Sequence, residues 1–573
     1  MAEFDLVVRG GTVVDGNGGD PRTADVAVVD GLVAEVGRVA GRGRREVDAD
    51  GALVTPGWVD AHTHYDGQVT WDDELEGSSA NGVTTVVMGN CGVGFAPVHA
   101  RDRDRLIDLM EGVEDIPGIA LHEGLSWNWT TFADFLSELD RIPHDVDLAT
   151  QVPHAPLRVH VMGARAAAHV EATPDEIAEM ARLAREAVAA GALGFTTSRT
   201  LAHKSISGEL TPSYDVGAEE LAAIAAAIGE LGTGVLQLVT DFPDPQAEFA
   251  LMRRMARVSG RPLSVSLMQL PPRPEVHREV LDFLVEAHAD GLEIRGQVAA
   301  RPVGMILGLS NVLNPFMTNP VWQRLAGLTP DEQAAAMRAP TLRAEILEAQ
   351  NREKFRQRIG GNLIHRYDLM YELAETPDYE PPSTEAISAR AAAAGISPVE
   401  LAYDIVAAGG MLYLVSANYV DHNLDAVREM LVHPHTVPGL SDGGAHVGTI
   451  CDASFPTTLL AHWARDRAGE RIPLPFVVQR QARDTAEAVG LRDRGVLAPG
   501  YRADLNVVDM DRVGLSRPEF RDDLPAGGRR MLQRSSGYLH TFVRGVETYR
   551  GLEETGALPG RLVRGAQPAP DLT

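Results

Sequence analysis

The sequence predicts an α/β protein built on a TIM-like (β/α)8 barrel, with strand-rich segments at both ends and one inserted subdomain. From about residue 55 to 487, short apolar strands alternate with helical patterns, which is typical of βα units and a parallel sheet. Eight strands are expected, beginning near Leu53, Val83, Asp147, Ala192, Gly234, Pro262, Leu292 and Thr436. Eight strands in βα order favour a closed barrel.

The two ends of the chain have a different pattern. Residues 4–50 and the stretch from about 495 to 545 contain short β-branched runs bounded by glycine or aspartate, which indicates small β structure. We therefore expect an N-terminal β segment at 1–54, a barrel at 55–487 and a C-terminal β segment with a tail at 488–573.

Helix signals separate the expected strands. Thr173 precedes Pro174, a typical N-cap and first helical residue, and the helical pattern then continues to Ala190. The span from about 299 to 400 is too long for one connection, and it contains its own helical pattern from Thr329 to Arg352. We expect it to be an inserted subdomain.

Composition excludes several classes of protein. The 573 residues carry a formal net charge of −28, which disfavours binding to nucleic acid or to anionic membranes. The chain has only two cysteines, Cys91 and Cys451, so a disulfide framework is not expected. The N-terminus lacks the basic and apolar regions of a signal peptide. We expect a cytoplasmic protein with a small-molecule substrate and no membrane partner. Both a monomer and a homo-oligomer are compatible with the sequence.

A pair of histidines follows the first expected strand. His62 and His64 stand at i and i+2, so in a strand both imidazoles would point to the same side. Two imidazoles at the end of a barrel strand are suitable metal ligands. A second pair, His433 and His435, precedes a strand and encloses a proline, which makes it a weaker candidate.

Several motifs together resemble the amidohydrolase superfamily. They occur in the superfamily's order: Gly-Thr-Val-Val-Asp-Gly, Pro-Gly-Trp-Val-Asp-Ala-His-Thr-His, Ser-Asp-Gly on the last strand, and Gly-Tyr-Arg-Ala-Asp-Leu. Within the superfamily, Gly82–Gly92, Val152–His154 with Leu157-Arg158, and Gly191–Thr197 resemble the N-acyl-D-amino-acid deacylase (D-aminoacylase) branch. The resemblance implies that the terminal β segments join into one small β-sandwich beside the barrel.

The resemblance also implies a metal site. His62 and His64 match the paired ligands of the first strand, and Cys91 matches the cysteine ligand of the branch. Asp442 matches the aspartate that contacts metal and transfers protons. Thiolate, imidazole and carboxylate are all suitable donors for zinc, although another divalent transition metal would also fit.

Two further histidines match less specific positions. His154 is expected either to polarise the substrate carbonyl or to be a structural histidine. His446 follows Asp442 by four residues and is expected to contact the metal ligands or to be structural.

The sequence departs from the family at the next strands. Val239 stands where strand 5 of the family carries a histidine, and Leu267 stands at the corresponding place on strand 6. Gln269 replaces a family lysine. Because both ligands of a second metal look absent, we expect one zinc ion per chain.

The substrate pocket of the family is also altered, because Gly296–Pro302 replaces its aromatic stretch on strand 7. Arg301, Arg199 and Lys204 are candidate replacements that would bind a substrate anion, or else solvated surface charges. The insertion, which begins beside Arg301, is expected to act as a lid or to pack against a neighbouring subunit.

These features predict a metal-dependent hydrolase of an amide C–N bond, with an N-acyl-D-amino-acid deacylase-like activity favoured. Two alternatives stay open. One is a hydrolase of cyclic amides or lactones from the same superfamily, and the other is a weakly active or non-catalytic homologue.

Overall fold

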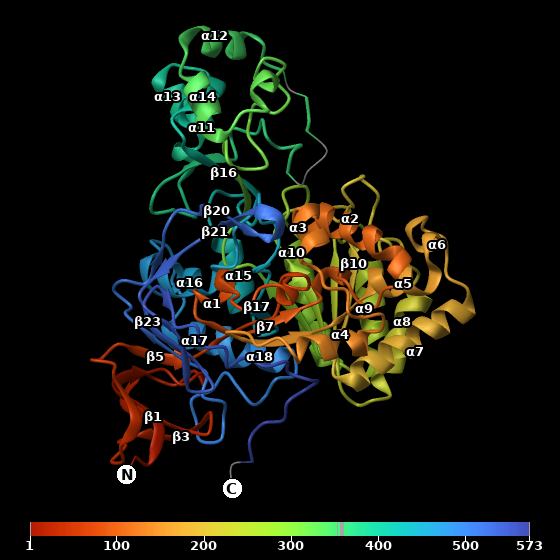
Figure 1. The fold of residues 1–573 in the computed structure, drawn as a ribbon, viewed down its shortest axis with the longest axis vertical. Helices are drawn as coiled ribbons and strands as arrows, with labels where there is room; N and C mark the ends of the chain where they lie inside the picture. Colours follow the sequence, from red (N-terminus) through yellow and green to blue (C-terminus); the bar gives the residue numbers. More distant parts are fainter. Residues whose placement is uncertain (1, 352, 356–359, 572–573) are drawn as a thin grey trace.

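The computed structural model describes residues 2–351, 353–355 and 360–571 and shows a mixed α/β fold. Figure 1 shows parallel strands and their helices in the middle, the insertion at the top and the N-terminal strands at the bottom. The parallel strands are β6 (Trp58–Asp60), β7 (Val83–Met88), β8 (Asp147–Thr150), β9 (Val152–Pro153), β10 (Gly194–Arg199), β11 (Val235–Thr240), β12 (Leu263–Leu267), β13 (Ile294–Val298) and β17 (Thr436–Pro438).

The parallel strands follow chain order. In the described residues, β6, β7 and β8 form one parallel sheet, and β9 to β13 with β17 form another. Beyond the strand ends, His64 N donates to Gly443 O at 2.7 Å and Asp442 N donates to His62 O at 3.1 Å. These bonds join the segment after β6 to the segment after β17, which is the adjacency that a barrel predicts.

The first expected strand is divided between two sheets. Residues Leu53–Pro56 form β5, which pairs with β1 (Phe4–Val13) and β18 (Leu505–Val508). After Gly57 the chain enters β6, which pairs with β7. A Cβ atom at Gly57 would lie 2.3 Å from Thr84 Oγ1, so the close approach at this crossing favours glycine.

Both ends of the chain contribute to one sheet. Among the described residues it has nine strands. Besides β1, β5 and β18, they are β2 (Arg22–Val29), β3 (Leu32–Gly37), β4 (Gly43–Asp48), β23 (Tyr538–Val543), β24 (Val546–Arg550) and β25 (Glu553–Glu554). Past this sheet, the tail forms isolated bridges to earlier residues, such as Gly560 to His144.

The insertion has its own antiparallel sheet and apolar core, and it ends later than the sequence suggested. Its elements are β14 (Val303–Leu307), α11 (Pro330–Met337), α12 (Pro340–Glu348), β15 (Met370–Leu373), α13 (Ile387–Ala394), α14 (Pro398–Ala407) and β16 (Met411–Ala417). Because β16 pairs with both β14 and β15, the unit extends beyond residue 400 to about 417. The single helix expected from Thr329 is divided into α11 and α12, and its expected end at Arg352 lies outside the described residues.

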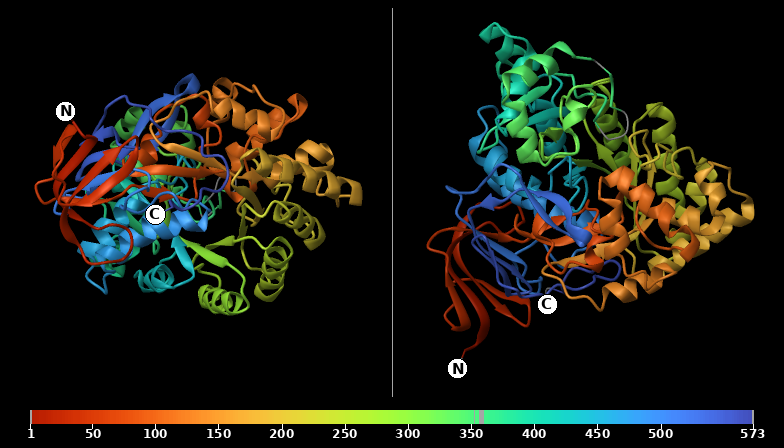
Figure 2. Two further views of the ribbon diagram at one scale, coloured as in Figure 1. Left: turned by 90° about the horizontal axis from the view of Figure 1, so that it is seen from below. Right: turned by 45° about the horizontal axis from the view of Figure 1, so that its top comes forward.

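Amphipathic helices cover the outside of the parallel strands (Figure 2). They include α5 (His154–Met162), α7 (Pro174–Ala190), α8 (Ala218–Gly229), α9 (Pro245–Ser259), α10 (Val276–Ala289) and α15 (Asp425–Val432). Another helix, α2 (Arg103–Glu114), belongs to the connection between β7 and β8 and lies above the strands in Figure 1. At α7, Thr173 and Glu176 form a reciprocal capping box, and Pro174 begins the helix as predicted.

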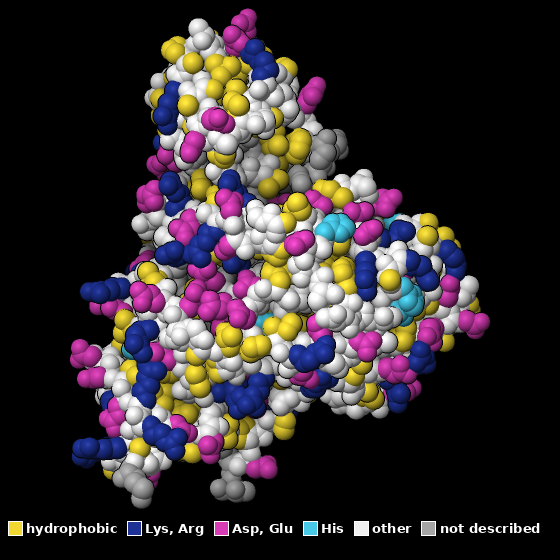
Figure 3. Space-filling view, viewed as in Figure 1, with side chains coloured by type: hydrophobic (Ala, Val, Ile, Leu, Met, Phe, Trp, Pro, Cys, Tyr) yellow, Lys and Arg dark blue, Asp and Glu magenta, His cyan; other side chains and the backbone are white. Residues whose placement is uncertain are grey.

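Acidic and basic side chains are interspersed over the face seen in Figure 3, as expected for a solvated surface. None of the helices in the described ranges combines the length and apolar character that a membrane crossing needs.

Candidate metal centre

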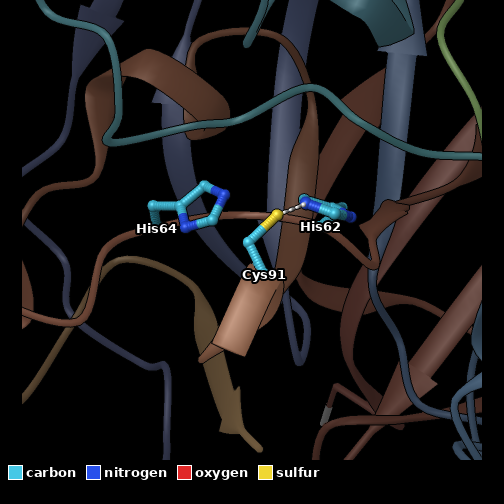
Figure 4. A group of neighbouring side chains, drawn as sticks. All are labelled: His62, His64 and Cys91. Atoms are coloured by element: carbon cyan, nitrogen blue, oxygen red, sulfur yellow. Dashed lines mark hydrogen bonds between the residues drawn. The ribbon is translucent and has the colours of Figure 1, made fainter. Parts of the chain in front are cut away.

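Two histidines and a cysteine converge beyond the ends of β6 and β7. Their side chains are buried, and their donor atoms lie within 4.8 Å of one another (Figure 4). His62 Nε2 lies 3.3 Å from Cys91 Sγ. Cys91 follows β7 on a short 3-10 turn (Asn90–Gly92), where its φ of 55° re-aims the side chain. This unusual backbone at a cluster of donors is typical of a functional site.

Asp442 completes the group from the segment that follows β17. Its Oδ1 atom lies 3.5 Å from Nε2 of His62 and 3.5 Å from Nε2 of His64. With metal–nitrogen bonds of about 2.0–2.1 Å, two donors on a tetrahedral zinc ion lie roughly 3.4 Å apart. Asp442 Oδ1 is buried and has no hydrogen-bond partner in the described part of the chain. The spacing and the unpartnered oxygen both fit a bound cation.

The two histidine rings have side-chain partners at their Nδ1 atoms, on the side away from Asp442. Gln297 on β13 donates from Nε2 to Ser264 Oγ at 2.9 Å, which directs its Oε1 atom to His62 Nδ1 at 2.6 Å. A proton on Nδ1 therefore leaves the Nε2 lone pair free for a metal. Behind His64, Nδ1 lies 3.3 Å from Glu114 Oε1.

Burial and neighbouring charges shift the pKa values of the residues in this group. Burial lowers the pKa of His62 to about 4 and raises the pKa of Cys91 to about 11. Burial alone would raise the pKa of Asp442, but His64, His62 and His446 together hold it below its usual range. Without a cation the thiol is therefore protonated, and metal binding must displace its proton.

His446 lies beside this group, as expected. Its Nε2 atom is 4.0 Å from Asp442 Oδ2 and 3.6 Å from Glu114 Oε2. Burial lowers the pKa of the His446 imidazole to about 4, which favours the neutral ring.

In the described part of the chain, His154 forms no hydrogen bond with His62, His64, Cys91 or Asp442, and its contacts favour the structural alternative expected for it. Its Nδ1 atom is 2.9 Å from Thr197 Oγ1 and its Nε2 atom is 2.8 Å from Glu220 Oε1. Glu220 also pairs with Arg158. Because both ring nitrogens have protein partners and the side chain is buried, the contacts are those of a structural histidine.

Arg301, expected either to bind a substrate anion or to be a solvated surface charge, is buried and paired within the protein. The side chain is 1% exposed, and its Nη2 atom donates to Cys451 O at 2.6 Å and to Asp452 Oδ1 at 3.1 Å. Its guanidinium lies 3.7 Å from the ring centroid of Tyr379 in the insertion. Arg301 thus connects the insertion to the segment after β17 instead of facing a substrate.

The other two cations expected to bind substrate lie apart from the metal group. Arg199 pairs with Glu248 at 2.8 Å and donates to Val216 O at 2.9 Å. Lys204 is exposed on the loop after β10, where its backbone forms a bridge with Leu210. In the part of the chain that the structure describes, neither residue forms a hydrogen bond or ion pair with His62, His64, Cys91 or Asp442.

β11 and β12, the strands on which the family was expected to carry a second pair of histidine ligands, have apolar or neutral polar residues here. Ser266 pairs with Gln297, so its side chain shares the inward face on which Gln297 meets His62. Leu267 points outward, because a Cβ atom at Gly296 would lie 2.9 Å from its Cδ2 atom. The inward neighbour of Val239 is therefore Ser266, which corrects the register expected for strand 6.

Three residues near the metal group were not predicted. Gln297 and Glu114 stand behind the histidine ligands, and His203 follows β10. His203 Nδ1 lies 2.8 Å from Ser198 Oγ, and burial, with smaller contributions from His64 and His446, lowers the pKa of its imidazole to about 3. No spacing in the sequence connects these residues to the His62–His64 pair.

The chain is similar in sequence to known deacylases. The chain is 27% identical over 571 residues to N-acyl-D-glutamate deacylase of Alcaligenes xylosoxydans xylosoxydans, covering 98% of this chain and 97% of the relative. D-aminoacylase of the same organism is 37% identical over 195 residues, covering 34% of this chain and 37% of that protein.

Solved structures extend the comparison to the fold. A D-aminoacylase structure described as having a binuclear metal center, with one-metal activation and second-metal attenuation, matches with a TM-score of 0.66 and 25% identity, covering 98% of this chain and 100% of that one. N-acyl-D-glutamate deacylase from Bordetella bronchiseptica, solved with zinc and a phosphonate inhibitor, shares the fold with a TM-score of 0.64 and 24% identity, covering 98% of this chain and 99% of that one. A family model described as "Amidohydrolase family" matches residues 45–549. The chain belongs to the amidohydrolase family.

Proposed function

We propose that this protein is a metal-dependent hydrolase that cleaves the amide bond of N-acyl-D-amino acids or closely related linear amides. The observation that carries the proposal is the convergence of Asp442 Oδ1 on the Nε2 atoms of His62 and His64, 3.5 Å from each. The activities named for the relatives, D-aminoacylase and N-acyl-D-glutamate deacylase, supply the substrate class.

His62, His64 and Cys91 would hold the metal, with Asp442 as a further donor beside a position left open for water. A zinc ion bound there would act as a Lewis acid that lowers the pKa of water and polarises the amide carbonyl. Asp442 accepts a proton from the attacking water and returns it to the leaving nitrogen. Its depressed pKa keeps the carboxylate ionised, as a group that contacts a metal must be.

Space for water adjoins the proposed base. A cavity of about 40 Å³ lies between the segment around Asp442 and β21 (Gly528–Leu532). Since one water needs about 10–15 Å³ of such volume, the cavity holds a few water molecules. It supports delivery of the attacking water to Asp442.

The composition of the inner strand faces supports a single tightly bound zinc ion per chain. Val239 and Ser266 stand on β11 and β12 where a second pair of imidazoles would be needed. Gln237, two residues before Val239, uses its Oε1 atom to accept from Cys91 N at 3.2 Å, so it supports the cysteine loop. We further propose a (β/α)8 barrel for the parallel strands and a small β-sandwich for the terminal sheet.

A substrate panel tests the activity. Zinc-loaded protein is incubated with the D and L enantiomers of N-acetylglutamate and N-acetylleucine, and with a hydantoin as the cyclic amide. We expect release of acetate from a D enantiomer, with its L partner and the Asp442→Asn protein as controls. Opening of the ring alone would favour the cyclic-amide alternative, and no turnover of any substrate would favour a non-catalytic homologue.

A further inference from the structure

Glu114 is a buried carboxylate for which the proposed reaction has no role. It is the last residue of α2 and is 1% exposed. In the described part of the chain, Oε1 has no hydrogen bond, although it lies 3.3 Å from His64 Nδ1, which also has none. Burying a carboxylate oxygen without a hydrogen bond is costly, so this position calls for an explanation.

The end of α2 is attached directly to the segment that carries Asp442. The backbone N–H of His446 donates to the backbone oxygen of Glu114. The next residue, Asp115, takes a φ of 54° and accepts from Thr449 Oγ1 at 2.8 Å. These two attachments fix the backbone from which the Glu114 side chain extends.

The two histidine ligands have matching surroundings. Each Nε2 atom faces Asp442 Oδ1 at 3.5 Å, while the Nδ1 atom of His62 faces Gln297 Oε1 at 2.6 Å and that of His64 faces Glu114 Oε1 at 3.3 Å. The difference is that Gln297 is neutral whereas Glu114 can carry a charge. A carboxylate behind a ligating imidazole fixes its tautomer and makes it a stronger donor.

We propose that Glu114 is a positioning residue of the metal centre. Its Oε1 atom accepts a hydrogen bond from Nδ1–H of His64, and this keeps the Nε2 lone pair of His64 directed toward the metal position. Its second oxygen, 3.6 Å from His446 Nε2, keeps that ring beside Asp442. The inference rests on the proposed metal site, but it does not depend on which substrate the protein hydrolyses.

The test measures metal affinity without substrate. Glu114→Ala removes the acceptor, and Glu114→Gln keeps the shape and one acceptor oxygen without the charge. Asp108→Asn is the matched control, because Asp108 is an exposed carboxylate on the same helix. Zinc dissociation constants are measured for the full-length proteins by competition with a chromophoric chelator, and circular dichroism confirms that each is folded.

We expect Glu114→Ala to weaken zinc binding by about 10- to 100-fold and Glu114→Gln to weaken it less, as is typical when a partner behind a ligand is lost. Asp108→Asn should bind zinc as the parent does. Folded Glu114 variants with parental affinity would overturn the proposal. So would a parent that binds two zinc ions and a variant that binds one, because Glu114 would then be a ligand itself. If alanine prevents folding, the glutamine variant still decides. Because zinc affinity is measured without substrate, a protein that hydrolyses none of the proposed substrates could still show the effect of Glu114 on zinc binding. The two failures are therefore distinguishable.

Discussion

Oδ1 of Asp442 lies 3.5 Å from Nε2 of His62, although the two residues are 380 positions apart in the sequence. The contact is possible because Asp442 N donates to His62 O at 3.1 Å, which joins the segments that follow β6 and β17. The carboxylate is thereby placed where it can both contact a metal and exchange a proton with water.

Replacing Asp442 with asparagine should leave the fold intact and remove most of the activity. The amide has nearly the same shape, but it cannot accept a proton from water. We expect turnover to fall by about 10²- to 10⁴-fold, the range for lost general acid–base catalysis. Steady-state kinetics on the best substrate of the panel measure the change, and circular dichroism checks the fold. Turnover close to that of the parent would exclude Asp442 as the proton carrier.

The stability of the metal-free protein should fall as the pH rises from about 6.5 to 8. Burial raises the pKa values of Asp60 and Glu114 to about 7, so each carboxyl group stabilises the fold at low pH and loses that contribution as the pH passes through its folded pKa. His62 and His446, with pKa values lowered to about 4, act in the opposite direction, but only below the ordinary histidine value of about 6.5.

Thermal unfolding in chelator and in saturating zinc measures this effect. The bound cation offsets the charge of the buried carboxylates, so the increase in Tm caused by zinc should be larger at pH 8 than at pH 6.5. Asp60→Asn should make the metal-free profile shallower, while Asp108→Asn should leave it unchanged. A metal-free Tm that is constant or rises over this range would contradict the prediction.

Replacing Arg301 with alanine should destabilise the protein without changing its preference for charged substrates. The change leaves Asp452 buried without its partner at 3.1 Å, and breaking such a buried pair costs about 3–5 kcal/mol. Urea denaturation measures the free energy of unfolding. Arg324→Ala is the control, because its pair with Glu345 is exposed and worth about 0–1 kcal/mol. A selective rise in KM for an N-acyl amino acid over a neutral amide would restore the substrate role.

Much of the fold could be predicted, because strands in βα order are separated by recognisable helix starts. The expected strands near Val83, Asp147 and Thr436 begin where the structure begins them. The division of residues 53–60 between two sheets could not be predicted. A continuous apolar run does not show that Leu53–Pro56 pairs with β18, about 450 residues away.

Motifs beside strand ends were enough to predict that His62, His64 and Cys91 lie close together, while metal binding by them stays a prediction. His62, His64 and Cys91 stand beside strand ends, and the structure places their donor atoms in one group. The surroundings of Arg301 were not predicted, because its guanidinium is paired with Asp452 by tertiary packing that the local sequence does not reveal. Glu114 was missed because it looks like an ordinary polar position near the end of a helix.

The most direct test of the central claim is a zinc titration of turnover. Metal-free protein is titrated with zinc while hydrolysis of the best N-acyl-D-amino acid is followed. The account predicts negligible turnover without zinc and a rise that reaches its plateau at one equivalent per chain. Full turnover in the presence of chelator, or a plateau that requires a second equivalent, would contradict it.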